Sequence, residues 1–183
     1  MPVLYSKRLR LRAPEREDVP LFLKWVNDPE VTENLEQVAA YNLLQEEAWF
    51  EKMSSGPRTE MPLVIEIHQQ DSDVWIPIGN IGFADIHQIN RSAEIGIMIG
   101  EKEYWDQGYG SEAMRRTCQY GFEELNLHRI YLRVFEGNNR GKRAYQKIGF
   151  VYEGTMREAR YHRGRYWGVD FMSIIKTEWV QNP

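Results

Sequence analysis

Two glycines separated by one residue stand just before a run with helical character, in the stretch YWDQGYGSEAM (residues 104–114). Gly108 and Gly110 would let consecutive backbone N–H groups converge at a helix start, where the helix dipole also favours an anion. The same pattern also fits an ordinary helix entry whose first turn is capped by Ser111. The stretch therefore indicates either a phosphate-binding loop or a simple turn, and other parts of the sequence must decide between them.

Motifs for other kinds of chemistry are incomplete. The stretch GNNRGKR (137–143) is similar to a phosphate loop, but one residue is missing between its glycines and Arg143 replaces the required Ser or Thr. The stretch GYGSEA lacks the third glycine of a dinucleotide fingerprint, and the hydrolase motif Gly-x-Ser-x-Gly is absent. The histidines are scattered and form no ligand pair at helical spacing, so we expect no metal site. They are His68, His87, His128 and His162.

The composition predicts one globular domain, spanning residues 1–183. The chain is 42% hydrophobic and 27% charged and has a formal net charge of −4. Cys118 is the single cysteine, which excludes an internal disulfide and suits the reducing cytoplasm. No apolar stretch approaches the roughly 18 residues that span a bilayer, so we expect no membrane partner. The mild acidity disfavours direct binding of nucleic acid and suits a cationic substrate.

The elements that must position the glycine loop follow from hydrophobic periodicity. Residues with period-two or continuous apolar character predict strands, and those with helical spacing predict helices. The expected strands are 7–13, 61–67, 75–86, 92–99, 128–135, 149–161 and 166–175, and the expected helices are 19–28, 42–55, 111–125 and 138–148. This order indicates an α+β fold, a mostly antiparallel sheet of about seven strands flanked by about four helices. The strand–helix–strand unit at 94–135 implies a parallel or splayed strand pair.

Two segments in this order resemble the GNAT acetyltransferase superfamily. They are AEIGIMIGEKEYWDQGYGSEAM (93–114) and NLHRIYLRVFEGNNRGKRAYQKIGFVYEG (126–154). The family's loop reads Arg/Gln-x-x-Gly-x-Gly/Ala, and its later segment has Asn, then Tyr about seven residues on, then Gly-Phe. The likeness extends through GRYWGVDFMSI and is closest to ribosomal-protein alanine N-acetyltransferases, and also near spermidine N-acetyltransferases. One departure is that the family's first Arg/Gln falls on Trp105, although Gln107 could take over its contact with phosphate.

The resemblance implies acetyl-CoA as the donor co-substrate, no metal, and a splayed parallel strand pair at the acetyl-CoA site. In this interpretation the pantetheine arm pairs like an extra strand, and small residues such as Gly96 and Gly100 permit the splay. The diphosphate would lie on backbone amides of the loop. The implied cofactor-binding residues are Ile97, Met98, Ile99, Gln107, Gly108, Tyr109, Gly110 and Ser111.

Acetyl transfer to an amine needs a neutral amine, a donor to the oxyanion and a proton for the departing thiolate. By resemblance, Tyr145 is the general acid and Asn138 hydrogen-bonds the cofactor; their spacing of seven places them on one helix face, about 10 Å apart along the axis. An ordinary core tyrosine is the alternative. Glu94 is a candidate base acting through water, or else a surface carboxylate paired with Arg91 or another neighbour. A backbone N–H of residues 97–99 would stabilise the oxyanion.

The expected acceptor is a primary amine, with a protein N-terminal α-amine favoured by overall likeness and a polyamine or aminoglycoside as alternatives. Acidic residues of the stretch PEVTENLEQ, namely Glu30, Glu33 and Glu36, could attract a cation or form a solvated loop. Aromatic residues near the C-terminus, namely Tyr161, Tyr166 and Trp167, could line the acceptor pocket or simply pack across strands.

Further interpretations remain open from the sequence. Four arginines near the C-terminus, at positions 157, 160, 163 and 165, could meet ribosomal RNA or the phosphates of CoA, or form an ordinary surface. A non-catalytic acyl-CoA-binding module would keep the glycine loop and dispense with Tyr145, and a purely structural protein would bind no CoA. Homodimers are common in the family, so a homodimer is also possible.

Overall fold

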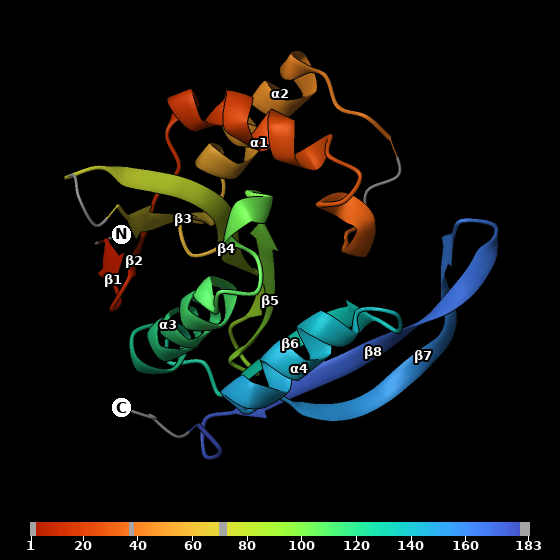
Figure 1. Ribbon diagram of the computed structural model, residues 1–183. Coiled ribbons are helices and arrows are strands. Elements are labelled where there is room, and N and C mark those ends of the chain that lie inside the picture. Colours follow the sequence, from red (N-terminus) through yellow and green to blue (C-terminus); the bar gives the residue numbers. More distant parts are fainter. Residues whose placement is uncertain (1–2, 37–38, 70–72, 180–183) are drawn as a thin grey trace. The chain divides into compact units, whose positions relative to one another are not determined.

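The computed structural model describes residues 3–36, 39–69 and 73–179 (Figure 1). The helices are α1 (Val19–Val26), α2 (Leu43–Ser55), α3 (Tyr109–Glu123) and α4 (Asn139–Ile148), with short 3-10 turns at Arg16–Asp18, Thr32–Asn34 and Lys102–Tyr104. The strands are β1 (Leu4–Tyr5), β2 (Leu9–Arg12), β3 (Leu63–His68), β4 (Trp75–His87), β5 (Ser92–Ile99), β6 (Arg129–Phe135), β7 (Val151–His162) and β8 (Arg165–Ile175).

The strands form one sheet in the order β1-β2-β3-β4-β5-β6-β8-β7. The pairings β1–β2, β2–β3, β3–β4, β6–β8 and β7–β8 are antiparallel, whereas β5 and β6 are parallel. The predicted α+β class, with four helices and a mostly antiparallel sheet that contains one parallel pair, is therefore confirmed. The strand that the sequence pattern missed is β1, because two residues are too few to show a period.

The chain divides into two compact units, which we describe separately. The first unit comprises Met1–Phe83 and Gly96–Thr117, and the second comprises Ala84–Ile95 and Cys118–Pro183. No helix in the described part of the chain is both long enough and apolar enough to cross a membrane.

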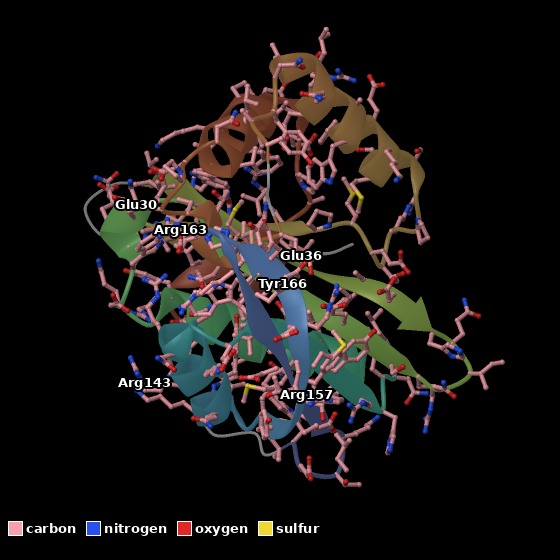
Figure 2. All side chains as sticks on the ribbon, turned by 90° about the vertical axis from the view of Figure 1, so that its right-hand side faces the viewer. Glu30, Glu36, Arg143, Arg157, Arg163 and Tyr166 are labelled. Atoms are coloured by element: carbon pink, nitrogen blue, oxygen red, sulfur yellow. The ribbon has the colours of Figure 1, made fainter. Side chains whose placement is uncertain are left out.

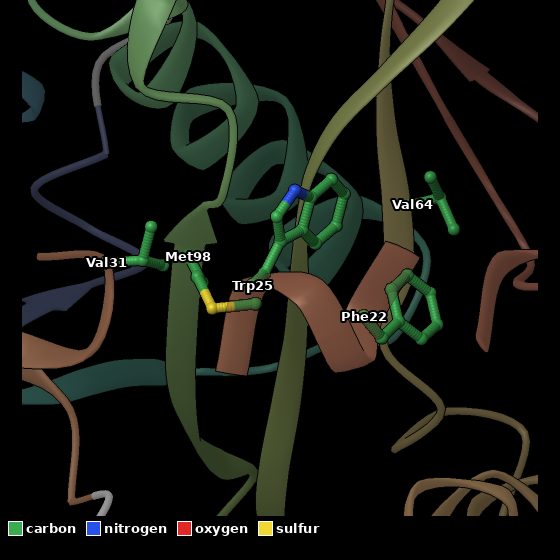
Figure 3. Packing of buried hydrophobic residues seen from close by; sticks show 5 residues of the cluster. All are labelled: Phe22, Trp25, Val31, Val64 and Met98. Carbon is green, nitrogen blue, oxygen red and sulfur yellow. The ribbon is translucent and has the colours of Figure 1, made fainter. Parts of the chain in front are cut away.

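The core of the first unit is built where α1 meets strands β3 and β5. Phe22 and Trp25 of α1 are almost fully buried and lie in one apolar cluster with Val31, Val64 and Met98 (Figure 3). Helix α1 starts at Val19 with Pro20 in its first turn, where a missing N–H costs nothing. The apolar face of this helix is thus the face that anchors it.

Helix α2 covers the same cluster and is fixed at its start by a reciprocal cap. The Asn42 side chain accepts a hydrogen bond from the Gln45 N–H at 3.0 Å, and the Gln45 side chain accepts one from the Asn42 N–H at 2.9 Å. One turn farther on, Trp49 packs edge-on against Phe22, with ring centroids 6.0 Å apart. The two aromatic side chains therefore join α2 to α1.

The second unit contains β6, the β7–β8 hairpin and α4. Strand β6 pairs with β8 from Arg129↔Ile175 to Phe135↔Val169. Helix α4 ends at Ile148 and is capped by Gly149, whose φ of 115° favours glycine, and the chain then enters β7. A side chain at Gly149 would press against Ile174 of β8, at 3.0 Å, so α4 ends directly on this sheet. Tyr145 is carried by this helix.

Candidate functional site

The glycine loop leads directly into α3. Gly108 has a φ of 83°, which disfavours any residue with a side chain, and α3 begins at the next residue. The Glu112 N–H donates to the Gly108 carbonyl at 3.0 Å, which closes the first turn of α3. The N–H groups of Tyr109, Gly110 and Ser111 precede that bond, so they have no partner within the helix. Ser111 lies inside the first turn, and Gly108 rather than Ser111 occupies the cap position.

The end of β5 lies beside this helix start. A side chain at Gly110 would meet Ile99 at 3.6 Å and Ile97 at 3.8 Å, which are ordinary contacts. The Met98 side chain points the other way, into the core cluster, and a side chain on Gly79 of β4 would overlap the Met98 carbonyl. Because backbone groups alternate sides along a strand, those of Ile97 and Ile99 face away from β4. Of the three residues expected beside the pantetheine arm, Ile97, Met98 and Ile99, the side chain of Met98 therefore belongs to the core.

The glycines expected to permit a splay have different environments. A side chain at Gly96 would meet nothing within 4 Å, whereas one at Gly100 would overlap the Trp25 ring. Gly100 is thus required by the packing of Trp25, a role that the sequence interpretation did not foresee. The parallel pairing of β5 with β6 runs from Ser92↔Arg129 to Glu94↔Tyr131.

Trp105, at the position where the family has Arg or Gln, is used for structure. Its indole Nε1 donates to the Ile99 carbonyl at 2.8 Å, and its ring packs against the core cluster of the first unit. Gln107, the suggested replacement, donates from its side-chain amide to the Glu103 carbonyl at 2.6 Å. Both side chains are therefore engaged with the protein's own backbone.

Arg8 is a residue at the loop that sequence analysis missed. Its Nε donates to Glu112 Oε2 at 2.8 Å and its Nη1 donates to the Gln107 carbonyl at 3.1 Å. Its guanidinium also lies over the Tyr109 ring, 4.3 Å from the centroid. Arg8, which lies just before β2, thus holds both the loop and the first turn of α3. No local signal marks this contact, because about a hundred residues separate its partners in the sequence.

Glu112 is the carboxylate of this cluster. It accepts hydrogen bonds from the Arg8 backbone N–H at 2.9 Å and from Ser6 Oγ at 2.8 Å, besides the bond from the Arg8 side chain. Burial would raise the pKa of Glu112, but these hydrogen bonds outweigh it and hold the pKa below its usual value. The carboxylate is therefore ionised at neutral pH and fixed beside the helix start.

In the second unit, Asn138 lies directly before α4 and Tyr145 lies within its second half. Asn138 precedes the helix and caps it, since its Oδ1 accepts from the Gly141 N–H at 2.9 Å. The Tyr145 ring is half-buried and lies 6.2 Å from the Phe150 ring. Burial raises the pKa of the Tyr145 hydroxyl, and the nearby charge of Arg140 opposes this only in part. A phenol in this state stays protonated at neutral pH, as a proton donor must.

Helix α4 is tied to the sheet on the side of Tyr145 by a polar cluster. Lys142, three residues before Tyr145, forms an ion pair with the buried Asp170 of β8 and donates to the Glu136 carbonyl at 2.8 Å. Thr155 of β7 also donates to Asp170. Burial would raise the pKa of Asp170, but the bonds from Lys142 and Thr155 lower it below the usual value. The cluster fixes the helix that carries the phenol.

Glu94, the candidate base, is paired. Its Oε1 accepts from Arg133 Nε at 2.8 Å, so the neighbour that binds it is Arg133, whereas Arg91 donates to Asn126 Oδ1 at 3.5 Å. The side chain of Glu94 is 16% exposed and that of Arg133 is 40% exposed. The pair agrees with the alternative in which Glu94 is a carboxylate bound by a neighbouring arginine. The other oxygen, Oε2, is the one through which Glu94 could hold a water molecule.

The residues considered for the acceptor lie on two elements. Figure 2 shows Glu30 and Glu36 in the segment between α1 and α2, and Tyr166 on the β7–β8 hairpin. Lys102 binds Glu30 at 2.9 Å and Asp28 at 2.8 Å, so one cation offsets part of this acidic segment. Glu33 is half-buried and Glu36 is exposed. These acids lie in the first unit.

Tyr166 pairs across the hairpin with Tyr161, as the cross-strand alternative predicts. Their ring centroids are 5.2 Å apart, and the two residues are 62% and 63% exposed. The arginines of the hairpin are partly engaged with rings, since Arg160 lies over Phe135 and Arg165 over Trp167. Among the described residues no group of three or more His, Cys, Asp or Glu side chains could hold a metal ion.

The residues therefore form two clusters with separate chemical capacities. The first unit can bind an extended anionic molecule. The donors are the backbone N–H groups at the start of α3, and Arg8 and the end of β5 lie beside them. In the second unit, a protonated phenol on a fixed helix can donate a proton. An acyl-CoA thioester needs both capacities, a grip on its diphosphate and a proton for its departing sulfur.

Comparison with known proteins agrees with this chemistry. The family model described as "Acetyltransferase (GNAT) domain" matches residues 8–151. An uncharacterised N-acetyltransferase of Bacillus licheniformis, p20, is 30% identical over 184 residues, which cover 98% of this chain and 99% of p20. Bacillus subtilis YdaF, named as a candidate ribosomal N-acetyltransferase, is 36% identical over 101 residues, which cover 55% of each chain.

A solved structure is similar over nearly the whole chain. The spermidine N-acetyltransferase of Vibrio cholerae, in complex with CoA and spermine, matches with a TM-score of 0.85 and 29% identity, covering 94% of this chain and 98% of that one. The family model alone spans most of the sequence, including the glycine loop and Tyr145. The chain belongs to the GNAT acetyltransferase family and is an acetyl-CoA-dependent N-acetyltransferase.

Proposed function

We propose that the chain transfers the acetyl group of acetyl-CoA to a primary amine of a polyamine. The observation that carries this choice is the extent of the likeness to the Vibrio cholerae spermidine N-acetyltransferase, which covers 94% of this chain. The acidic segment of the first unit supports it, because Asp28, Glu30, Glu33 and Glu36 gather four carboxylates in one short stretch of chain. A group of carboxylates attracts a polycation and raises its local concentration.

In the proposed mechanism the amides of Tyr109, Gly110 and Ser111 bind the diphosphate of acetyl-CoA, and the backbone of Ile97 and Ile99 aligns its pantetheine arm. The thioester supplies the activated acetyl group. The neutral amine nitrogen bonds to the carbonyl carbon, the C–S bond breaks, and the thiolate takes the proton of Tyr145 Oη. The raised pKa of Tyr145 supports this role, since the hydroxyl stays protonated until it is needed.

The amine must lose a proton before or during the attack. Glu94 is the proposed acceptor of this proton, through a water molecule bound at its other carboxylate oxygen, Oε2, while Oε1 stays with Arg133. Desolvation in the site would contribute as well, because burial lowers the pKa of an amine. Asn138 is proposed to contact the cofactor with its side-chain NH2, since its Oδ1 is occupied by the helix cap.

A second acceptor class is a protein N-terminal α-amine. The likeness to YdaF favours it, because the identity reaches 36% where the two sequences align. The exposed tyrosines of the hairpin, Tyr161 and Tyr166, also suit contact with a peptide, since aromatic side chains bind at low entropic cost. That likeness covers 55% of the chain, which is why we place this acceptor second.

A panel of amines tests the proposal. Thiol release from acetyl-CoA is measured with spermidine, spermine, an aminoglycoside and peptides that begin with Ala or Ser, using Tyr145→Phe as the catalytic control. We expect kcat/KM for the best polyamine to exceed that for every peptide by at least about tenfold. A kcat/KM that is at least about tenfold higher for a peptide than for every polyamine would instead favour the second acceptor class. Thiol release that no amine accelerates would contradict both.

A further inference from the structure

The proposed grip on the diphosphate lacks a side-chain cation at the expected place. Trp105 stands where the family has Arg or Gln, and its indole is bonded to the Ile99 carbonyl. The side chain of Gln107 is bonded to the Glu103 carbonyl. Two negative charges on a diphosphate are better held by amides together with a cation than by amides alone. The question is therefore which residue supplies the charge.

Arg8 lies at the loop with part of its guanidinium unused. Nε is bonded to Glu112, Nη1 to the Gln107 carbonyl, and one face lies over Tyr109. In the described part of the chain Nη2 has no bonded partner, and it lies 3.4 Å from the point where a side chain on Gly108 would begin. The Arg8 side chain is 46% exposed, so a ligand can reach it.

Resting on the proposed function, we infer that Arg8 is a diphosphate-binding residue, whose Nη2 donates to the diphosphate held by the loop amides. The bonds of Nε and Nη1 hold the guanidinium rigidly, so little side-chain entropy is lost when the ligand arrives. The bond to the Gln107 carbonyl also keeps the loop in the conformation that presents its amides. Arg8 thus shapes the site and contacts the ligand.

The neighbouring Glu112 makes a second effect of Arg8 possible. Its carboxylate, 17% exposed, lies in the first turn of α3 and would repel a diphosphate if Arg8 did not neutralise it. An effect of Arg8 on CoA binding could therefore arise through direct contact or through neutralisation alone. The two possibilities predict different results when Glu112 is changed together with Arg8.

The test measures CoA affinity by calorimetric titration and turnover with S-acetylpantetheine, an acetyl donor that carries no phosphate. Arg8→Gln is expected to weaken CoA binding about 10- to 100-fold, the range for a charged hydrogen bond. Turnover of S-acetylpantetheine should change by less than about threefold, because that donor has no diphosphate for Arg8 to contact.

Arg10→Gln is the matched control. Arg10 lies two residues farther on, in β2, where its Nε is paired with Glu66 Oε2 at 2.5 Å and its guanidinium lies over the Trp75 ring, 4.5 Å from the centroid. It therefore combines an ion pair and a ring contact as Arg8 does, but with partners outside the loop. It should leave CoA affinity unchanged. Arg8→Lys keeps the positive charge but lacks the planar guanidinium with its several N–H donors, so it should bind CoA with intermediate affinity. This variant replaces Arg8→Gln in the test if Arg8→Gln lowers the melting temperature too far.

The double variant Arg8→Gln/Glu112→Gln separates contact from neutralisation. Direct contact predicts that the double variant binds CoA as weakly as Arg8→Gln, and recovery of wild-type affinity would overturn the inference. Equal losses with CoA and S-acetylpantetheine, or unchanged CoA affinity in Arg8→Gln, would overturn it too. A wild-type protein that binds no CoA would instead contradict the proposed function itself.

Discussion

Gly108 and Gly110 are separated by one residue, yet substitution by alanine should have opposite effects at the two positions. Gly108 has a φ of 83°, where a residue with a side chain is strained by about 1–2 kcal/mol. Alanine also restricts the unfolded chain, which returns about 0.4–1 kcal/mol. The net expectation for Gly108→Ala is a loss of about 1 kcal/mol in the free energy of unfolding.

Gly110 lies inside α3, where no positive φ is needed. A side chain there would meet Ile99 at 3.6 Å and Ile97 at 3.8 Å, without overlap. Gly110→Ala should therefore raise the free energy of unfolding by about 0.4–1 kcal/mol. For a chain of this length about 1 kcal/mol shifts the melting temperature by roughly 2–4 °C, so the two variants should differ by several degrees.

Thermal unfolding followed by circular dichroism gives the two melting temperatures, and calorimetric titration with CoA gives the affinities. Gly108→Ala should also weaken CoA binding, because a changed φ turns the following amides away from their common point. Gly110→Ala should bind CoA nearly as the wild type does, because its methyl group would face Ile97 and Ile99. A shift of both melting temperatures in the same direction would refute the separate roles, as would a neutral Gly108→Ala.

The remaining predictions concern proton transfer and charge. Tyr145→Phe should lower kcat at least about tenfold with CoA affinity unchanged, and unchanged kcat would remove Tyr145 as the acid. Because burial raises the pKa of Tyr145, its deprotonation should not limit the rate below about pH 10. Glu94→Gln should alter the pH–rate profile, and an unaltered profile would leave Glu94 as the ion-pair partner of Arg133. Hydrogen bonds from Arg129 lower the pKa of Glu153 to about 2, so its stabilising effect is present above about pH 4.5 and is lost as the pH falls toward 2. Glu153→Gln should accordingly lower the melting temperature at pH 6 and have little effect near pH 2, and an equal effect at both would refute this.

Hydrophobic periodicity was sufficient to predict most elements of the fold. The strand expected at 92–99 has those bounds in the structure, and the helices differ from expectation by a few residues at their ends. The period is set by burial of one face, which is a local property of the sequence. The exception, β1 at Leu4–Tyr5, is defined by its pairing with β2.

Partners of charged side chains were not predictable in the same way. The glycine loop could be located because a positive φ, such as that of Gly108, favours glycine, and glycine is visible in the sequence. The partner of Glu94 is Arg133, and that of Glu30 is Lys102, and neither follows from spacing along the chain. Which cation reaches a carboxylate depends on strand order and register, which only the folded chain determines.

Position 105 shows how such a tertiary contact changes the meaning of a motif. The pattern of the family would suggest that tryptophan here weakens donor binding, because a contact with phosphate is lost. In the structure Trp105 closes the end of β5 through the Ile99 carbonyl and packs against the core, a task that leaves no reach toward an anion. The charge must then come from another part of the chain, and Arg8, just before β2, brings a guanidinium to the same loop. The departure from the pattern therefore indicates a relocated cation rather than a weakened site.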